Sequence, residues 1–153
     1  GANVITTTST KEKVKKAILL GADEVINYQI ENVKERVDDI TNGHGVDVIF
    51  DHVGAGTWDM TSTSLSTGGR HGIVGVTDGY QTELQLGTLF LKNQTIMGIM
   101  MGRREDLVSI VEMAKTGLIS GVLHKTFELQ DAKEAHQMME TGDYFGKLVL
   151  KIS

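Results

Sequence analysis

Hydrophobic and polar positions follow two alternating patterns along most of the chain. Short runs of β-branched or continuously apolar residues, typical of strands, are separated by segments whose apolar residues share one helical face. The strands are predicted at residues 3–8, 24–27, 46–50, 71–76 and 95–100. The helices are predicted at residues 11–20, 33–40, 57–65 and 103–115, and residues 84–91 are predicted to be irregular or a short helix.

This alternation is typical of a parallel sheet with helices on both faces. The strands recur about every 20 to 25 residues, the interval that one crossover helix requires. The run VDVIF at 46–50 is almost continuously apolar, which predicts that both faces of this strand are covered. We therefore predict an α/β fold with a doubly wound, Rossmann-like parallel sheet.

The end of the chain has a different pattern. A strand is predicted at 125–129, a helix at 131–140 and a closing strand at 147–152. The closing strand, KLVLKI, alternates polar and apolar residues, which indicates a strand with one exposed face. We expect this strand–helix–strand extension to form a separate sheet, and we predict that the chain divides into residues 1–122 and 123–153.

Composition excludes several classes of partner. The net charge of −5 and the lack of a basic stripe argue against a nucleic-acid partner. No apolar run approaches the roughly 18 residues needed to span a bilayer, so no membrane partner is expected. Cysteine is absent, which removes disulfides, thiolate nucleophiles and cysteine-bound zinc and is compatible with a cytoplasmic location.

Groups for acid–base or nucleophilic chemistry are sparse. The histidines lack the spacing of metal ligands, so we expect structural or solvent-exposed roles for His44, His52, His71, His124 and His136. Asp47 and Asp51 flank a predicted strand, a pattern that usually reflects sheet polarity. No hydrolase triad can be assembled, and we predict neither a catalytic residue nor a metal ligand in this chain.

Glycines and hydroxyl residues follow the predicted strands. In open parallel sheets, ligands bind beyond the carboxyl ends of the strands, where small residues let a ligand approach the backbone. An ordinary turn explains any one of these sites, but their joint occurrence favours a ligand site. The residues concerned are Thr8, Ser9, Thr10, Lys11, Lys13, Tyr28, Val53, Gly54, Gly75, Val76, Thr77, Met100, Met101 and Gly102.

Six segments in register resemble the medium-chain dehydrogenase/reductase superfamily, which includes zinc-type alcohol dehydrogenases and quinone oxidoreductases. They are LGADEVINY (20–28), GVDVIFDHVG (45–54), GGRHGIVGV (68–76), IMGIMMGRREDL (96–107), FELQDAKEAHQMMETG (127–142) and FGKLVLKI (145–152). The resemblance covers essentially the whole chain. It implies the cofactor-binding portion of an NAD(P)-dependent oxidoreductase that transfers hydride. Residues 1–122 would be a partial Rossmann domain, and residues 123–153 would return toward a catalytic domain.

The chain departs from the family at its start. Family domains open with a strand, a GxGxxG-type loop and a helix that hold the pyrophosphate, and this sequence contains no GxGxxG. The sheet is therefore expected to be incomplete at its N-terminus. In relatives, an upstream domain carries the zinc ligands or the substrate pocket. Zinc is therefore expected only through such an upstream domain, and this chain alone is expected to be inactive. The alternative is a truncated, non-catalytic module for nucleotide binding or oligomerisation.

The missing family strand is central in the strand order 3-2-1-4-5-6. Its absence would leave the strands at 3–8 and 46–50 without a shared neighbour, with unpaired backbone groups. We expect one of three arrangements: the first of these strands closes onto the second, another chain supplies a strand, or the chain is cut from a longer parent. The strand at 95–100 would lie at the sheet edge, the dimer seam in many relatives, so a homo-oligomer is expected.

The resemblance also implies cofactor contacts. Thr8 stands where NAD-preferring relatives carry an acidic residue, and its neutral side chain removes repulsion toward a 2′-phosphate. Ser9, Lys13 and Tyr28 are then placed to donate to that phosphate, which favours NADP, with NAD as the alternative. The remaining implied contacts are Val53 and Gly54 at the adenosine, Gly75, Val76, Thr77, Met100 and Met101 at the nicotinamide end, and Lys147 at the pyrophosphate. An exposed, unliganded lysine is the alternative for Lys13 and Lys147.

Overall fold

The computed structural model describes residues 1–152 and divides the chain into two compact units, Gly1–Met101 and a second that begins at Gly102. Ser153, the last residue of the predicted segment 123–153, lies outside the described residues. The segment 123–152 belongs to the second unit, and a domain boundary between residues 122 and 123 stays a prediction. No helix in the described part of the chain is long and apolar enough to cross a membrane.

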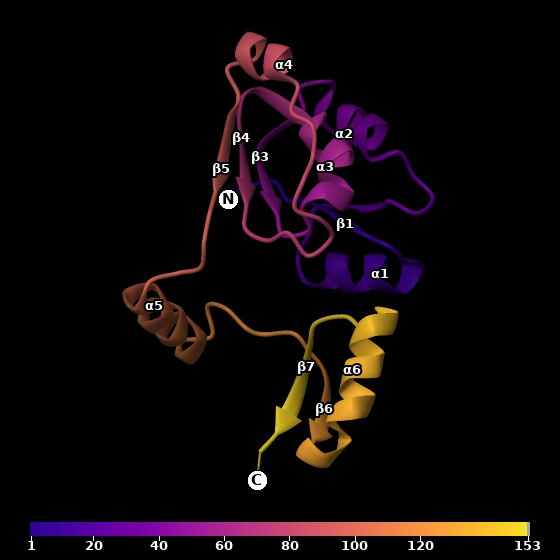
Figure 1. The fold of residues 1–153 in the computed structure, drawn as a ribbon, viewed down its shortest axis with the longest axis vertical. Helices are drawn as coiled ribbons and strands as arrows, with labels where there is room; N and C mark the ends of the chain where they lie inside the picture. Colours follow the sequence, from indigo (N-terminus) through magenta and orange to yellow (C-terminus); the bar gives the residue numbers. More distant parts are fainter. Residues whose placement is uncertain (153) are drawn as a thin grey trace. The chain divides into compact units, whose positions relative to one another are not determined.

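The first unit begins with two parallel strands and two helices, of which β1, α1 and α2 are labelled in Figure 1. These elements are β1 (Ile5–Thr8), α1 (Lys11–Leu19), β2 (Glu24–Asn27) and α2 (Val33–Thr41). Strands β1 and β2 pair in parallel, with Thr8 opposite Asn27. Ile26 packs with Val33 and Val37 of α2 in a small buried core. This arrangement matches the predicted strand–helix alternation.

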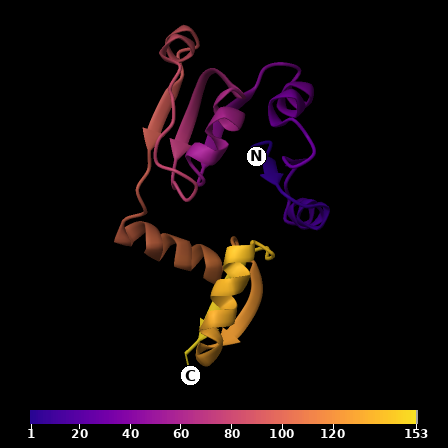
Figure 2. The ribbon, with the colours of Figure 1, turned by 45° about the vertical axis from the view of Figure 1, so that its right-hand side comes forward.

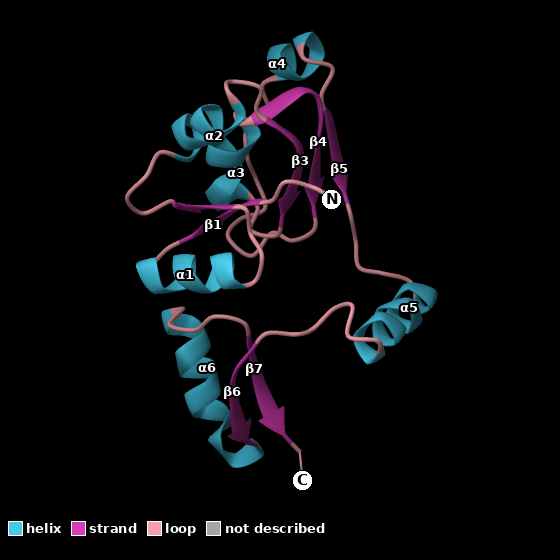
Figure 3. Ribbon diagram, turned by 180° about the vertical axis from the view of Figure 1, so that it is seen from behind, coloured by secondary structure: helices cyan, strands magenta, loops and turns pink. Residues whose placement is uncertain are grey.

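A three-stranded parallel sheet forms the rest of this unit, in the order β3-β4-β5. The strands are β3 (Val46–Asp51), β4 (Leu65–Ile73) and β5 (Thr95–Gly98), connected by α3 (Ala55–Ser62) and α4 (Leu86–Leu91). Figure 3 shows the three strands side by side. The predicted α/β fold with parallel, Rossmann-like sheets is confirmed.

The two sheets of this unit do not join. Among residues 1–152, β1 pairs only with β2, and β3 pairs only with β4, so β1 does not close onto β3 (Figure 2). Instead, a cavity of about 1060 Å³ lies between them, lined by residues 1–7 and 44–50 and by side chains of α2. The predicted incompleteness of the sheet is therefore visible as a gap beside β3.

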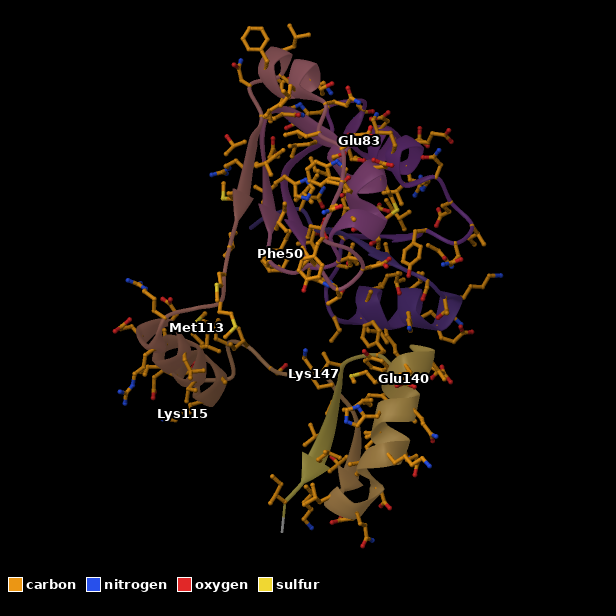
Figure 4. The ribbon with its side chains drawn as sticks, in the orientation of Figure 1. Phe50, Glu83, Met113, Lys115, Glu140 and Lys147 are labelled. Carbon is orange, nitrogen blue, oxygen red and sulfur yellow. The ribbon has the colours of Figure 1, made fainter. Side chains whose placement is uncertain are left out.

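The gap corrects one expectation about β3. Its apolar run predicted that both faces are covered, but Val48 is 56% exposed and Phe50 is 72% exposed. Phe50 is labelled in Figure 4. Val48, Ile49 and Phe50 all line the cavity beside β1, and only Ile49 of the three is buried. The sequence pattern fits a fully enclosed strand, and the described residues enclose only one side of it.

The boundaries around β4 also differ from the prediction. Residues 65–70 were expected to end a helix and form a turn, but β4 begins at Leu65. Gln94 holds this start of the strand, because its side-chain amide donates to the carbonyls of Leu65 (2.9 Å) and Ser66 (3.1 Å). The strand ends at Ile73, so residues 74–76 lie in a loop rather than in the predicted strand.

The second unit begins with α5 (Arg104–Lys115), whose first turn is capped by Asp106, since its carboxylate accepts from the backbone N–H of Arg103 at 2.8 Å. A separate sheet follows, as predicted. Its parallel strands are β6 (Leu123–Glu128) and β7 (Lys147–Lys151), linked by a short 3-10 turn, η1 (Leu129–Asp131), and by α6 (Ala132–Thr141). Polar and apolar exposure alternates along β7, as its sequence indicated.

Candidate functional site

The first four predicted cofactor residues lie together at the carboxyl ends of β1 and β2. Tyr28 follows β2, and its backbone N–H donates to the carbonyl of Thr8 at 3.1 Å. Ser9 follows Thr8, and Thr10 caps α1 by accepting from the backbone N–H of Lys13 at 3.2 Å. The cap therefore places Lys13 in the helical turn directly beyond β1. Thr8, Ser9 and Lys13 are half-buried, whereas Tyr28 is 41% exposed.

A second group of predicted residues meets at the carboxyl ends of β3 and β4. Gly54 has a φ of 93°, and a Cβ added there would lie 2.8 Å from the carbonyl oxygen of Gly79 and 2.9 Å from Cα of Val76. A Cβ added to Gly75 would lie 2.8 Å from the carbonyl oxygen of His52. Only glycine permits this close approach of the two loops.

Hydrogen bonds fix the two loops to each other. The backbone N–H of Asp78 donates to the carbonyl of Val53 at 2.9 Å, and the Thr77 hydroxyl donates to the carbonyl of His52 at 3.4 Å. The structure thus brings Val53, Gly54, Gly75, Val76 and Thr77 together, as the strand order predicted. Their contact with a cofactor stays a prediction.

The other predicted residues lie beyond β5 and in β7. Met100 and Met101 follow β5 and are 91% and 86% exposed. Met101 has a φ of 37°, which is uncommon for a residue with a side chain. Lys147 is the exposed first residue of β7 in the second unit, and its backbone N–H donates to the carbonyl of Val122 at 2.7 Å. A cofactor role for these residues stays a prediction.

Asp51 anchors the loop that follows β3, a role that the sequence analysis missed. Its Oδ1 accepts from the backbone N–H of Val53 at 2.8 Å and of Gly54 at 3.1 Å, and from the Thr57 hydroxyl at 3.3 Å. Burial raises the pKa of Asp51, but these hydrogen bonds and nearby His71 outweigh burial, so the pKa lies below its usual 3.8. The carboxylate is therefore ionised at neutral pH. An aspartate two residues before a Val-Gly turn is the signal that would have identified it.

His71 completes this buried group. It is 0% exposed, its Nε2 lies 3.4 Å from Oδ2 of Asp51, and its ring stacks on Trp58 with centroids 4.8 Å apart. Burial lowers the pKa of His71 below its ordinary 6.5, and the opposing effect of Asp51 is smaller. The ring is therefore neutral at pH 7, consistent with the structural role predicted for the histidines.

The lowered pKa of His71 predicts a pH-dependent stability. Between the native pKa and 6.5 the unfolded chain binds more protons, so the free energy of unfolding should fall as pH drops below 6.5, by at most about 1.4 kcal/mol per pH unit. Urea unfolding at pH 7.5 and 5.5, followed by emission of the single tryptophan, Trp58, measures this loss. His71→Gln should remove most of it, and exposed His136→Gln should not. If the unfolding free energy depended equally on pH in the unmodified protein, in His71→Gln and in His136→Gln, the lowered pKa of His71 would be contradicted.

Metal-ligand side chains do not gather anywhere in the described part of the chain. No group of three or more histidine, aspartate or glutamate residues within residues 1–152 is arranged to hold a metal ion. The polar groups that do converge are hydrogen-bond donors and backbone atoms at strand ends.

Comparison with known proteins identifies similar sequences over the whole chain. A family model described as zinc-binding dehydrogenase matches residues 1–116. A 2-haloacrylate reductase of a Burkholderia species is 31% identical over 98% of this chain, which corresponds to 48% of that protein. The chain thus spans about half the length of the curated relatives it matches.

Solved structures show the same fold. A crystal structure of an NAD-dependent alcohol dehydrogenase superposes with a TM-score of 0.92 at 32% identity, covering 100% of this chain and 45% of that one. A quinone oxidoreductase from Escherichia coli, solved in complex with NADPH, superposes with a TM-score of 0.83 at 29% identity. It covers 97% of this chain and 50% of that one.

Proposed function

Because the chain belongs to the zinc-binding dehydrogenase family, we propose that it forms the cofactor-binding portion of an NADP(H)-dependent oxidoreductase that transfers hydride to or from a small molecule. The family confirms the resemblance seen in the sequence. The substrate class, such as quinones, enones, alcohols or aldehydes, would be set by a domain outside residues 1–153. Zinc would likewise be bound only by that domain.

The observation that carries this proposal is the grouping of Thr8, Ser9, Lys13 and Tyr28 at the carboxyl ends of β1 and β2. In open parallel sheets this edge receives the ligand. The α1 N-terminus adds a favourable potential for a phosphate there. Val53 and Gly54 would border the adenosine from the loop that follows β3. The residues after β4 and β5 would contact the nicotinamide end.

The choice of NADP over NAD rests on Thr8. An acidic residue at this strand end would repel a 2′-phosphate, and threonine does not. Ser9, Tyr28 and Lys13 supply hydroxyl and ammonium donors beside it. The relatives include both a structure in complex with NADPH and an NAD-dependent enzyme, so the preference depends on these residues.

The cavity between β1 and β3 bears on the activity of the chain alone. We propose that a strand from a longer polypeptide pairs with both free strand edges, and that the segment joined to it packs over Val48 and Phe50. The loop after that strand would supply the backbone donors for the pyrophosphate. Residues 1–153 alone would then bind NADPH weakly and catalyse nothing.

Calorimetric titration with NADPH tests this proposal on two proteins, residues 1–153 and the longest gene product that contains them. The longer protein should bind NADPH at least about tenfold more tightly, because it adds the loop whose backbone N–H groups would bind the pyrophosphate. It should also oxidise NADPH in the presence of a quinone or an aldehyde. Tight binding without any turnover of either substrate would favour the non-catalytic nucleotide-binding module. No binding by the longer protein would refute the cofactor assignment.

Two further proposals concern the whole protein. The free edge of β5 in the β3-β4-β5 sheet offers a seam for a second copy, which supports a homo-oligomer. The lack of cysteine supports a cytoplasmic location. Sedimentation of the longest gene product, and its distribution between cell fractions, would check both.

A further inference from the structure

We propose that Asp51 is a positioning residue for the cofactor: it holds the loop at residues 52–54 in place for the adenosine and restricts this subsite to an uncharged group. The inference rests on the proposed function, because it concerns the loop that would border the adenosine. It goes further by assigning a role to a side chain that would not itself touch the cofactor, since Asp51 is only 4% exposed.

The carboxylate of Asp51 joins the loop to its surroundings from the end of β3. Its Oδ1 accepts from the backbone N–H groups of Val53 and Gly54 in the loop, and from the hydroxyl of Thr57 in α3. Its Oδ2 lies 3.4 Å from Nε2 of His71 on β4. Hydrogen bonds to an ionised acceptor are stronger than those between neutral groups. One buried carboxylate therefore ties the loop to both α3 and β4.

The backbone of the loop needs such a constraint at Gly54. This residue has a φ of 93° and a ψ of −134°, near a region that is essentially restricted to glycine. Glycine itself has little preference among the conformations open to it, so contacts must select this one. The hydrogen bonds to Asp51 are two of these contacts. The pairing of β3 with β4 is made by the backbone, so loss of the carboxylate should release the loop without separating the strands.

The backbone donors where the loop enters α3 all have acceptors within the protein. The N–H groups of Val53 and Gly54 bond Asp51, and those of the next two residues donate to the carbonyls of Gly79 (3.2 Å) and Asp78 (2.8 Å). A phosphate at a helix N-terminus requires free N–H groups. The buried negative charge of Asp51 also opposes an anion there. The subsite is therefore suited to an uncharged group, which the adenosine supplies.

Two substitutions at Asp51 separate the acceptor from the charge. Asp51→Ala removes both and should weaken NADPH and NADH by the same factor, about tenfold, because the two cofactors share the adenosine. Asp51→Asn keeps an oxygen for the two loop N–H groups and should lose only about threefold. Its amide group then faces Nε2 of His71, and the neutral ring can present a lone pair there by carrying its proton on Nδ1. Calorimetric titration of the longest gene product measures both affinities.

Gly68→Ala is the control for a general loss of stability. Gly68 lies near the start of β4, outside the loops, so this variant should destabilise the unit and leave both affinities unchanged. No loss in Asp51→Ala, an equal loss in Gly68→Ala, or a changed ratio of NADPH to NADH affinity would overturn the role of Asp51. If the unmodified longest gene product binds neither cofactor, the proposed function itself fails. The two failures are therefore distinguishable.

An NMR titration of residues 1–153 reads the loop directly and does not depend on the folding of Asp51→Ala. The probes are adenosine and inorganic phosphate. Adenosine should shift the amide signals of Val53 and Gly54 saturably, and phosphate should not. In Asp51→Asn, adenosine should bind about threefold more weakly at the same signals. A saturable shift of these signals by phosphate, or equal adenosine affinity in both proteins, would contradict the proposal.

Discussion

Replacing Gly54 with alanine is expected to destabilise the first unit by about 3 kcal/mol or more. A side chain at a φ of 93° and a ψ of −134°, close to a backbone region that is essentially restricted to glycine, costs roughly 1–3 kcal/mol. The new Cβ would also sit 2.8 Å from the carbonyl oxygen of Gly79 and 2.9 Å from Cα of Val76, so backbone would have to move, at about 1–3 kcal/mol. Urea unfolding followed by Trp58 emission measures the loss. Because the same loop would border the cofactor, NADPH binding should weaken as well.

Gly68→Ala is the matched control for this variant. Gly68 has a φ of 75°, but nothing lies within 4 Å of its added Cβ, so only the backbone conformation is penalised. Its cost should be about 1–2 kcal/mol. The difference between the two variants measures the contact between the loops after β3 and β4 together with any difference between the two backbone conformations. Equal destabilisation by Gly54→Ala and Gly68→Ala would show that this contact contributes little.

Replacing Thr8 with aspartate is expected to lower the affinity for NADPH by about 10- to 100-fold. A carboxylate beside the 2′-phosphate introduces a like-charge contact, and it competes for the donors of Ser9, Lys13 and Tyr28. The same carboxylate can accept hydrogen bonds from the ribose hydroxyls of NADH, so the affinity for NADH should stay the same or rise. Titration of the longest gene product with both cofactors measures the change in preference.

Thr82→Asp separates a local effect from a change in net charge. Thr82 is exposed in the segment before α4, and the substitution is chemically the same. It should leave the ratio of NADPH to NADH affinity unchanged. An equal loss of NADPH affinity in both variants would mean that Thr8 does not contact the 2′-phosphate.

Helices and strands with a clear hydrophobic periodicity and a recognisable terminating residue were predicted closely. Strand β2 matches its predicted range, and α1 and α2 differ from theirs by one residue. Each helix ends at a residue that sequence marks well, such as Asn42 with its left-handed φ of 51°. Local sequence therefore sufficed wherever local hydrogen bonds determine the structure.

The predictions were wrong where contacts with residues distant in the sequence determine the structure. Leu65–Arg70 contains small and polar residues that also suit a turn, and β4 starts there because Gln94, about 30 residues later, holds its first carbonyls. Exposure of Val48 and Phe50 depends on what packs on that face of β3, which its own residues do not reveal. Both features come from tertiary contacts.

The candidate site divides in the same way. The strand ends could be predicted because parallel strands bring their carboxyl ends to one edge. The linkage of Asp51, His71 and Trp58 could not, because a buried aspartate and a histidine 20 residues apart carry no shared local pattern. Predicted residues thus mark where the cofactor would lie, and the unpredicted ones hold the loop after β3 in place.

The central claim is that residues 8–28 bind the adenosine end of NADP. An NMR titration of residues 1–153 with adenosine 2′,5′-bisphosphate tests it directly, because this nucleotide contains no pyrophosphate and its binding does not need the pyrophosphate loop. Saturable shifts at Thr8, Ser9, Lys13 and Tyr28 and at Val53 and Gly54 beside the adenosine, with affinity about tenfold higher than for adenosine 5′-monophosphate, are the predicted result. Equal affinity for the two nucleotides, or shifts located away from these residues, would contradict the account.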